Sequence, residues 1–315
     1  MKTTPVTPAD LARSVLSVPP LARQANLDLA PDANRALIRH LEAGGVSTLL
    51  YGGNANFYNI GLYEYAALLD FLAEAAAPDS WVIPSAGPDF GKLLDQARVL
   101  RGSAFPTAMV LPQTFPATVE GSAHAIERFA EAYGRPVIVY IKAETFLTPP
   151  LVARLVKAGI VAAIKYAVVR IDPAIDPYLT ELVDLVDRKL IVSGIGERPA
   201  IVHMRDFGLP GFTSGSVCVG PRGSMRLLEA IKSRDYDAAA KLREAYLPLE
   251  NIRDELSPIR VLHEAVTLAG IADMGPMLPH LSNLQASEHP RLKAAAQQLL
   301  MHDRALAATQ EGAVA

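Results

Sequence analysis

The sequence predicts an α/β fold, namely a (β/α)8 barrel followed by a C-terminal helical extension. Short apolar runs alternate with helical patterns eight times over about 200 residues, which is what a closed barrel of parallel strands requires. The first run ends in Pro19-Pro20 and lacks the glycine-rich turn that follows the first strand of a doubly wound sheet. After residue 220 the strand-like runs stop, while helical spacing continues.

The first half of the barrel region contains four strand-like runs. A polar, proline-bearing segment over residues 1–13 precedes them and is expected to form a short helix or an arm. Runs rich in apolar and β-branched residues predict strands over residues 14–18, 46–51, 81–86 and 107–111. Apolar residues at helical spacing predict helices over residues 32–44, 62–76, 92–101 and 119–133.

The second half continues the same alternation. Strands are predicted over residues 136–141, 160–166, 190–193 and 211–214, and helices over residues 150–158, 176–188 and 198–207. Helical spacing alone remains over residues 225–233, 236–249, 258–269 and 291–308. We therefore predict two units, a barrel that carries the active site over residues 1–220 and an α-helical extension over residues 221–315. The tail over residues 310–315 is expected to be frayed.

Composition and charge exclude several classes of protein. The 315 residues are half hydrophobic and carry a net charge of −3, which indicates no nucleic-acid partner. No stretch approaches 18 apolar residues and the N-terminus opens no signal region, so we expect a cytoplasmic protein without a membrane partner. Cys218 is the single cysteine, and the seven histidines lack metal-site spacing. No metal or nucleotide is therefore expected.

One lysine stands at the end of a strand that is predicted to be buried on both faces. Residues 160–164 are apolar, and Lys165 follows them directly. Burial lowers the pKa of a lysine, and the neutral amine is a nucleophile toward carbonyl carbon atoms. We therefore interpret Lys165 as a Schiff-base lysine. The structural alternative is an ammonium group that reaches solvent past the strand end.

The carboxyl ends of the other strands supply the partners of this lysine, because the active site of a (β/α)8 barrel lies there. Tyr140, one strand earlier, can donate and accept protons during imine formation. The backbone N–H groups of Gly53 and Asn54 suit a substrate carboxylate. The alternatives are a tyrosine that fills the core and an ordinary tight turn.

Further candidates follow from position in the predicted barrel. Gly194, after the seventh strand, and Thr213, in the eighth, are the remaining predicted substrate contacts. Lys142 lies two residues after Tyr140 on the same strand face, where it can meet an anionic substrate or simply lie at the surface. Strand ends also bear Gln113, Thr114, Glu197 and Ser214.

Four segments match the motifs of a known family in order and spacing. Residues 137–140 are similar to its I-x-x-Y-N strand and residues 163–167 to its G-I-K-E-[AS] lysine strand. Residues 192–194 are similar to its S-G-[DS] strand end, and residues 258–262 to its N-P-x-P-[VI]-K segment. From about residue 14 to residue 284, the chain resembles the dihydrodipicolinate synthase / N-acetylneuraminate lyase family of Schiff-base barrels.

The resemblance implies an activity as well as a fold. It implies a carbon–carbon or carbon–oxygen lyase of the class I aldolase type, in which Lys165 binds pyruvate or another 2-keto acid as an imine and Tyr140 shuttles protons. Aldol cleavage, condensation and dehydration are all compatible with this chemistry. The resemblance also implies a homotetramer whose covalent imine requires no metal or nucleotide cofactor.

Departures from the family motifs argue against dihydrodipicolinate synthesis itself. The G-x-T-G-E loop is replaced by residues 52–56, GGNAN, which lack the threonine and the acidic residue. Residues 111–114, LPQT, stand where the family has T-P-Y-Y, and Ile141 replaces the asparagine after the strand-five tyrosine. The arginine that binds a second carboxylate in the synthase has no counterpart in residues 142–145.

Three hypotheses remain open on the sequence alone. The first is a lyase with a Lys165 imine. The second is a family member that has lost turnover and binds a 2-keto acid or a sugar acid. The third is a lyase of altered specificity in which Lys142 contacts the substrate. Phe57-Tyr58 is similar to the F-[FY]-[SA]-L motif of keto-deoxy-sugar-acid dehydratases, which makes dehydration a further alternative.

Overall fold

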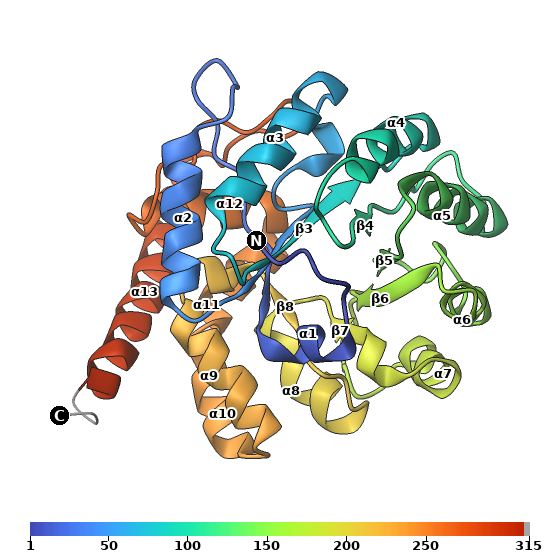
Figure 1. Cartoon of the computed structure of the whole chain (residues 1–315). Helices are drawn as coiled ribbons and strands as arrows, with labels where there is room; N and C mark the ends of the chain where they lie inside the picture. The colour runs from blue at the N-terminus through green and yellow to red at the C-terminus, as the bar shows by residue number, and fades with distance from the viewer. Residues whose placement is uncertain (312–315) are drawn as a thin grey trace.

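Eight parallel strands form the centre of the molecule in this computed structural model, which describes residues 1–311 (Figure 1). The strands neighbour one another in the order β7-β6-β5-β4-β3-β2-β1-β8. A parallel bridge between Ser193 in β7 and Phe212, just before β8, joins the two ends of this order. The sheet is therefore a nearly closed barrel with helices around it, and the predicted (β/α)8 fold is confirmed.

The observed strands all lie within the predicted runs, but several are shorter. In the first run, Leu16 and Ser17 pair with Thr48 and Leu49 of β2 on one side and with Thr213 and Ser214 of β8 on the other. The strands are β1 Leu16–Ser17, β2 Thr48–Tyr51, β3 Trp81–Ala86, β4 Met109–Val110, β5 Val137–Ile141, β6 Val161–Tyr166, β7 Ile191–Ser193 and β8 Thr213–Ser214.

The helices of the barrel follow the predicted alternation. Side chains at several N-caps accept hydrogen bonds from backbone N–H groups of the first turn. Asp89 accepts one from the N–H of Lys92, and Thr118 accepts one from the N–H of Gly121. The helices are α1 Pro8–Arg13, α2 Pro31–Ala43, α3 Leu62–Ala75, α4 Phe90–Arg101, α5 Val119–Tyr133, α6 Pro149–Lys157, α7 Pro177–Leu185, α8 Glu197–Asp206 and α9 Pro221–Lys232. Helix α9 begins four residues before the predicted start at residue 225, because Pro221 suits the first helical position.

The last part of the chain is helical, and one prediction for it is wrong. The single helix predicted over residues 236–249 is two helices, because Pro248 lacks the N–H that a continuous helix requires and instead stands in the first turn of the second one. The helices are α10 Tyr236–Glu244, α11 Leu247–Glu255, α12 Pro258–Leu268 and α13 His289–Glu311. Residues 310 and 311 of the predicted frayed tail belong instead to α13, and residues 312–315 lie outside the described residues.

Two clusters of buried apolar side chains stabilise the molecule. The larger one fills the barrel and the layer between strands and helices, and it includes Leu227 and Ile231 of α9. The smaller one lies among the last helices and includes Tyr246, Leu249 and Leu299. The division into units over residues 1–220 and 221–315 stays a proposal.

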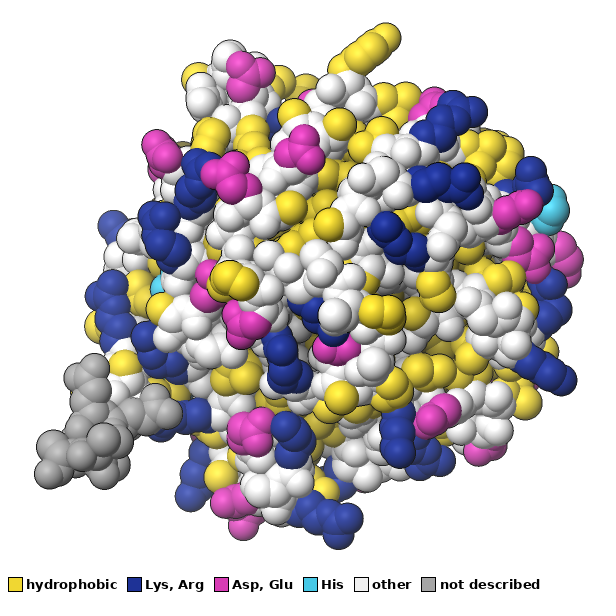
Figure 2. Space-filling model, in the orientation of Figure 1, with side chains coloured by type: hydrophobic (Ala, Val, Ile, Leu, Met, Phe, Trp, Pro, Cys, Tyr) yellow, Lys and Arg dark blue, Asp and Glu magenta, His cyan; other side chains and the backbone are white. Residues whose placement is uncertain are grey.

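The surface is polar and of mixed charge. Figure 2 shows basic and acidic side chains scattered among hydrophobic atoms over the face in view. Within residues 1–311, no helix combines the length and apolar character that are needed to cross a membrane. The same residues hold no cluster of three or more His, Cys, Asp or Glu side chains arranged for a metal ion.

Candidate active site at the carboxyl ends of the strands

A cavity of about 370 Å³ lies at the carboxyl ends of the barrel strands. All six predicted site residues contribute to its wall, from strands or loops that are far apart in the sequence. They are Gly53, Asn54, Tyr140, Lys165, Gly194 and Thr213. The barrel thus brings the candidates together in one place, and their roles in the reaction stay proposals.

Lys165 lies in the interior of the site, with only 4% of its surface exposed. It belongs to β6 and pairs in register with Tyr140 of β5 and Val192 of β7, so its backbone is held from both sides. Burial, assisted by the charge of Lys142, lowers the pKa of Lys165 from 10.5 to about 7. Near neutral pH a large fraction of this side chain is therefore a nucleophilic amine.

The neighbouring strand presents Tyr140 directly to this amine. The Nζ atom of Lys165 lies 4.4 Å from the centroid of the Tyr140 ring. Burial, together with the nearby Tyr58, raises the pKa of Tyr140 well above its ordinary value, so the phenol holds its proton at neutral pH. A protonated phenol beside a neutral amine is an arrangement suited to acid catalysis at a carbonyl oxygen.

The turn after β2 forms the opposite wall and offers unused donors. The N–H groups of Asn56 and Phe57 donate to the carbonyl oxygens of Gly53 and Gly52, at 2.9 and 3.1 Å. The backbone N–H groups of Gly53 and Asn54 have no acceptor among the described residues. Two adjacent free N–H groups at the edge of a cavity can bind a carboxylate.

The side chain of Asn54 has a structural task. Its Nδ2 atom donates a hydrogen bond to the carbonyl oxygen of Val18, at 3.0 Å, and so ties the turn to the end of β1. A Cβ atom on Gly215 would lie 2.7 Å from the same Nδ2 atom, so a larger residue at this position would displace the Asn54 side chain. Asn54 therefore contributes to the site mainly through the position of its backbone.

Gly194 permits a similar close approach beside the lysine. A Cβ atom at Gly194 would lie 2.6 Å from the carbonyl oxygen of Tyr166 and 3.0 Å from Cγ of Lys165. Its backbone N–H donates to that same carbonyl oxygen. The chain after β7 therefore packs directly against the end of β6, which holds the lysine stem in place.

Helix α11 adds two charged residues that position in the barrel does not predict. Arg253 and Asp254 line the cavity from the C-terminal extension. Arg253 is buried and pairs with Glu250 at 3.0 Å and with Asp254 at 2.9 Å. The strand-end rule does not reach these residues, because they enter the site only through the packing of α11 on the barrel. Tyr58, from the short 3-10 helix Phe57–Asn59, is a further wall residue.

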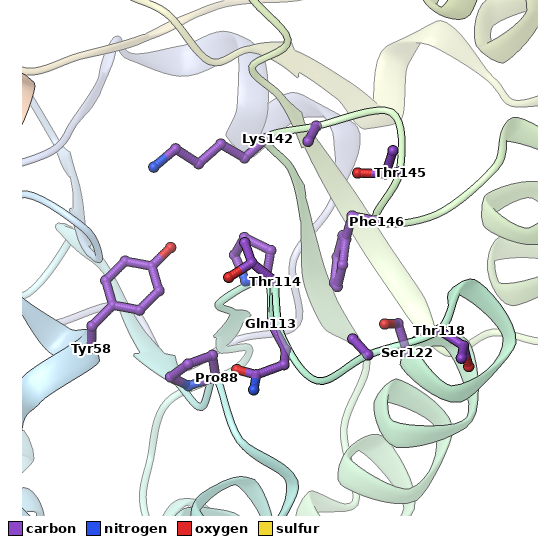
Figure 3. A pocket seen from close by; sticks show the side chains of 12 residues that line it. Tyr58, Pro88, Gln113, Thr114, Thr118, Ser122, Lys142, Thr145 and Phe146 are labelled. Atoms are coloured by element: carbon purple, nitrogen blue, oxygen red, sulfur yellow. The ribbon is translucent and has the colours of Figure 1, made fainter.

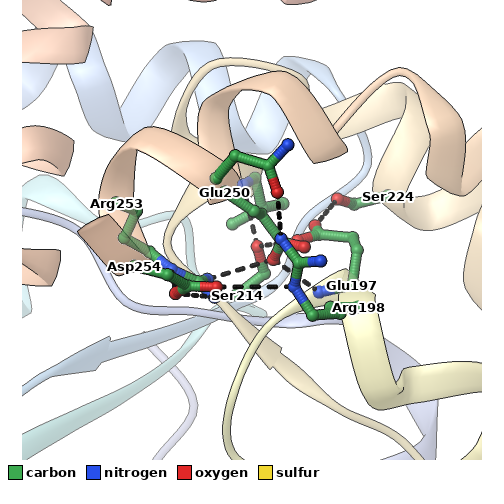
Figure 4. A network of polar contacts seen from close by, with 9 residues as sticks. Glu197, Arg198, Ser214, Ser224, Glu250, Arg253 and Asp254 are labelled. Atoms are coloured by element: carbon green, nitrogen blue, oxygen red, sulfur yellow. Dashed lines mark hydrogen bonds and ion pairs between the residues drawn. The ribbon is translucent and has the colours of Figure 1, made fainter. Parts of the chain in front are cut away.

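A buried network of polar side chains supports this wall from behind (Figure 4). Ser214 and Ser224 donate hydrogen bonds to the carboxylate oxygens of Glu197, and the N–H of Glu197 donates to Glu250 at 3.1 Å. Burial, reinforced by the neighbouring Glu197, raises the pKa of Glu250 to about 8. Glu197 and Ser214, two strand-end candidates, thus lie in this network and not in the cavity wall.

Gly196 connects the network to the site. A Cβ atom at Gly196 would lie 2.2 Å from Oε1 of Glu250, and the residue has a φ of +100°. Both facts require glycine, because L side chains rarely adopt that φ and no space is left for one. The network therefore fixes the path of the loop between β7 and α8, which borders the cavity.

A barrel with a buried lysine amine, a phenol and free backbone donors at its carboxyl end belongs to the class of (β/α)8 enzymes. The chain belongs to the Dihydrodipicolinate synthetase family, whose model matches residues 13–299. The expected family is thereby confirmed. The protein is a lyase-type enzyme of this family.

The relatives with curated names and the solved structures agree with this placement. A protein from Azotobacter vinelandii, named "Probable 5-dehydro-4-deoxyglucarate dehydratase", is 23% identical over 302 residues, covering 90% of this chain and 94% of its own. YagE, a prophage protein from E. coli solved in complex with pyruvate, is 22% identical with a TM-score of 0.80, covering 91% of this chain and 98% of its own.

A third similar protein is dihydrodipicolinate synthase from Agrobacterium tumefaciens. Its structure is 19% identical with a TM-score of 0.81, covering 93% of this chain and all of its own. At this identity the likeness concerns the fold.

Proposed function

We propose that the protein is a Schiff-base lyase that acts on pyruvate or a related 2-keto acid. Lys165 is the imine-forming residue and Tyr140 the general acid and base. The observation that carries the proposal is the buried side chain of Lys165, whose pKa is lowered to about 7 and whose Nζ atom lies 4.4 Å from the centroid of the Tyr140 ring. Reactive amines of this kind are recognised by a lowered pKa beside a proton donor.

The proposed reaction begins with binding of the keto-acid carboxylate to the N–H groups of Gly53 and Asn54. The Lys165 amine attacks the keto carbon, and the carbonyl oxygen takes a proton from Tyr140 to give a carbinolamine. Loss of that oxygen as water leaves the imine. In aldol cleavage the protonated imine accepts the electron pair of the carbon–carbon bond that breaks, which leaves an enamine, and condensation is the reverse. In dehydration it accepts the electron pair of a carbon–hydrogen bond at the adjacent carbon, whose proton goes to a base. Neither route uses a metal or nucleotide cofactor.

The remaining predicted contacts border the same space. Gly194 lets the chain after β7 pack against Lys165, and Thr213 brings a hydroxyl group to the cavity wall from β8. In this proposal Thr213 hydrogen-bonds the bound substrate, because a threonine hydroxyl both donates and accepts.

A second candidate is dehydration of a keto-deoxy sugar acid by the same imine. The name of the Azotobacter vinelandii relative favours it, and so does the Phe57-Tyr58 pair next to the carboxylate-binding turn. In this reaction the carbon next to the imine loses a proton to a base, and the resulting enamine expels the hydroxyl group from the following carbon, which leaves as water after protonation. The two candidates share every residue named above.

Borohydride trapping tests the proposal. Reduction in the presence of pyruvate or a keto-deoxy sugar acid should add the mass of the reduced ligand to the peptide that contains Lys165. The Lys165→Met variant should form no adduct, whereas Lys157→Met, which changes an exposed lysine on α6, should react like the native protein. The absence of an adduct with every 2-keto acid, where a family member reacts, would overturn the proposal.

The assembly and location of the protein are also proposed. We infer a cytoplasmic homotetramer, on the strength of the family resemblance. Sedimentation equilibrium should then give four times the chain mass of 33.8 kDa. A mass of one chain at micromolar concentration would contradict the assembly.

A further inference from the structure

A second cavity, of about 550 Å³, lies beside the cavity that contains Lys165. The two cavities share Tyr58 and Lys142 in their walls. Figure 3 shows the head groups of both side chains pointing into the same part of this second cavity. A ligand bound covalently to Lys165 can therefore extend past these two residues into the adjoining space.

The charge of the second cavity is positive. Among the described residues that line it, Lys142 is the single charged side chain. Lys142 has neither an ion pair nor a hydrogen bond within residues 1–311, whereas its neighbour Glu144 pairs with Arg170. Arg253, on the far side of the first cavity, already pairs with Asp254 and donates a hydrogen bond to Glu250. Lys142 is solvent-exposed, and an unpaired cation in a cavity wall attracts an anion.

Neutral polar groups make up much of the remaining wall. They come from the segments after β4 and β5 and from the start of α5, and they are Gln113, Thr114, Thr118, Ser122 and Thr145. The Nε2 atom of Gln113 donates to the carbonyl oxygen of Phe115, at 2.8 Å, which leaves its Oε1 atom free to accept. Hydroxyl and amide groups of this kind suit a ligand with several hydroxyl groups.

We propose that this second cavity is the subsite for the distal end of the substrate and that Lys142 binds an anionic group there. The substrate class is then a hydroxylated 2-keto acid with a second anion at its far end, either a carboxylate or a phosphate. This assignment rests on the proposed function, since the imine at Lys165 fixes the near end. It makes Lys142 a residue of specificity, because its contact lies several bonds away from the reacting carbon.

The test compares matched substrates on the full-length protein and its Lys142→Ala variant. The pair 2-keto-3-deoxygluconate and 5-dehydro-4-deoxyglucarate differs at the far end, a hydroxymethyl group against a carboxylate. The 6-phosphate of the first compound tests phosphate as the alternative anion. Pyruvate, which is too short to reach the subsite, reports imine formation alone. The measurement is the concentration of each compound that half-saturates borohydride trapping.

The native protein should bind the compound with the preferred anion about 10- to 100-fold more tightly than the hydroxymethyl compound, which is the range for a charged hydrogen bond. Lys142→Ala should abolish that preference. At pH 9, where the amine of Lys165 is deprotonated in both proteins, it should leave the half-saturating concentration of pyruvate within about threefold of the native value. Lys142→Arg, which keeps the charge, should retain part of the preference. The compound that shows the effect decides between carboxylate and phosphate.

Other outcomes overturn the assignment. The assignment is wrong if the native protein binds all three long compounds with equal affinity. It is also wrong if Lys142→Ala lowers the affinity for all three compounds by the same factor. If pyruvate also fails to trap on the native protein, the proposed function itself has failed. If pyruvate traps normally and the anion has no effect, only the subsite has failed.

Discussion

The Nζ atom of Lys165 lies over the face of the Tyr140 ring, 4.4 Å from its centroid. This contact favours the ammonium form through the ring quadrupole, but burial disfavours it more strongly, because the pKa of Lys165 falls to about 7. The Tyr140 hydroxyl has no hydrogen-bond partner within residues 1–311, so it remains available to a ligand. The pair thus places a nucleophile and a proton donor on one side of the cavity.

The first prediction concerns the pH dependence of imine formation. Because the amine form of Lys165 is the nucleophile and its pKa is about 7, the rate of borohydride trapping with subsaturating pyruvate should rise between pH 6 and pH 8 and then level off. Lys142→Ala removes a cation that lowers this pKa, and should therefore shift the midpoint to higher pH. A midpoint near the ordinary lysine value would contradict the assigned environment.

The second prediction is that Lys165→Met stabilises the protein. Well below pH 7 the folded and unfolded chains both carry the proton on Lys165, so the cost of burying the charge is fully present. As pH rises from 7 toward 10.5, the unfolded chain alone keeps the proton and the cost falls. Methionine should raise the free energy of unfolding by about 2–4 kcal/mol at pH 6, since each pKa unit corresponds to about 1.4 kcal/mol.

Urea unfolding of the native and Lys165→Met proteins at several pH values measures this effect. The gain should shrink above pH 7, whereas a gain that does not change with pH would point to packing alone. Lys157→Met, on an exposed surface, is the matched control and should change the free energy by less than about 0.5 kcal/mol.

The third prediction separates proton transfer from binding. Tyr140→Phe keeps the ring that faces Lys165 but removes the hydroxyl group. Turnover should fall by about 10²- to 10⁴-fold, which is the usual contribution of a general acid or base, while the folded structure and the near-end contacts persist. Steady-state kinetics on the substrate identified by trapping measure the loss.

The control for this variant is Tyr63→Phe, because Tyr63 is fully exposed on α3. It should retain native turnover. Tyr140→Phe with unchanged turnover would remove Tyr140 from the mechanism, and the hydroxyl of Tyr58, which lines the same cavity, would then be the next phenol to test.

The fourth prediction concerns the carboxylate-binding turn. In Gly215→Ala the new Cβ atom would lie 2.7 Å from Nδ2 of Asn54 and 2.2 Å from a methyl group of Leu262. The leucine can move, but displacement of Asn54 breaks its hydrogen bond to Val18 and shifts the free N–H groups. The concentration of pyruvate that half-saturates the protein should rise by about tenfold, and the free energy of unfolding should fall by about 1–3 kcal/mol.

Isothermal titration calorimetry or borohydride trapping with pyruvate measures this change. Gly91→Ala on α4 provides a control, because the nearest atom to a Cβ there lies 3.7 Å away. Its affinity for pyruvate should equal that of the native protein. Equal affinity in Gly215→Ala as well would show that the turn does not hold the ligand.

The fifth prediction uses the buried network behind the site. An unfolded chain releases the proton of Glu250 near pH 4.5, whereas the folded protein keeps it until about pH 8. Stability from this group is therefore lost as pH rises from 4.5 to 8. Glu250→Gln has no titrating proton. The free energy of unfolding of this variant, relative to that of the native protein, should therefore be higher at pH 8 than at pH 5 by about 1–3 kcal/mol.

Thermal and urea unfolding of both proteins at pH 5 and pH 8 check this difference. Glu244→Gln, which changes the last residue of α10 outside the network, is a suitable control. A native-to-variant difference that is the same at both pH values would mean that Glu250 is ionised in the folded protein.

Local patterns located the barrel and its central residues well. Short apolar runs placed each of the eight strands, and the strand-end rule selected Lys165 and Tyr140 as candidates. The split at Pro248 was missed because helical apolar spacing continues across it. Arg253 was missed because a helix surface gives no sign of which other element it will contact.

The sequence by itself determined the fold class and singled out Lys165 as the candidate residue, because both follow from short-range chemistry. A buried strand has a characteristic pattern, and a lysine at its end stands out. Only the tertiary structure decided that the donors of Gly53 and Asn54 remain free, that Arg253 already has a partner in Asp254 and that Lys142 has none within residues 1–311. Those properties depend on distances between segments that are remote in the chain, and electrostatic and hydrogen-bond energies are set by such distances.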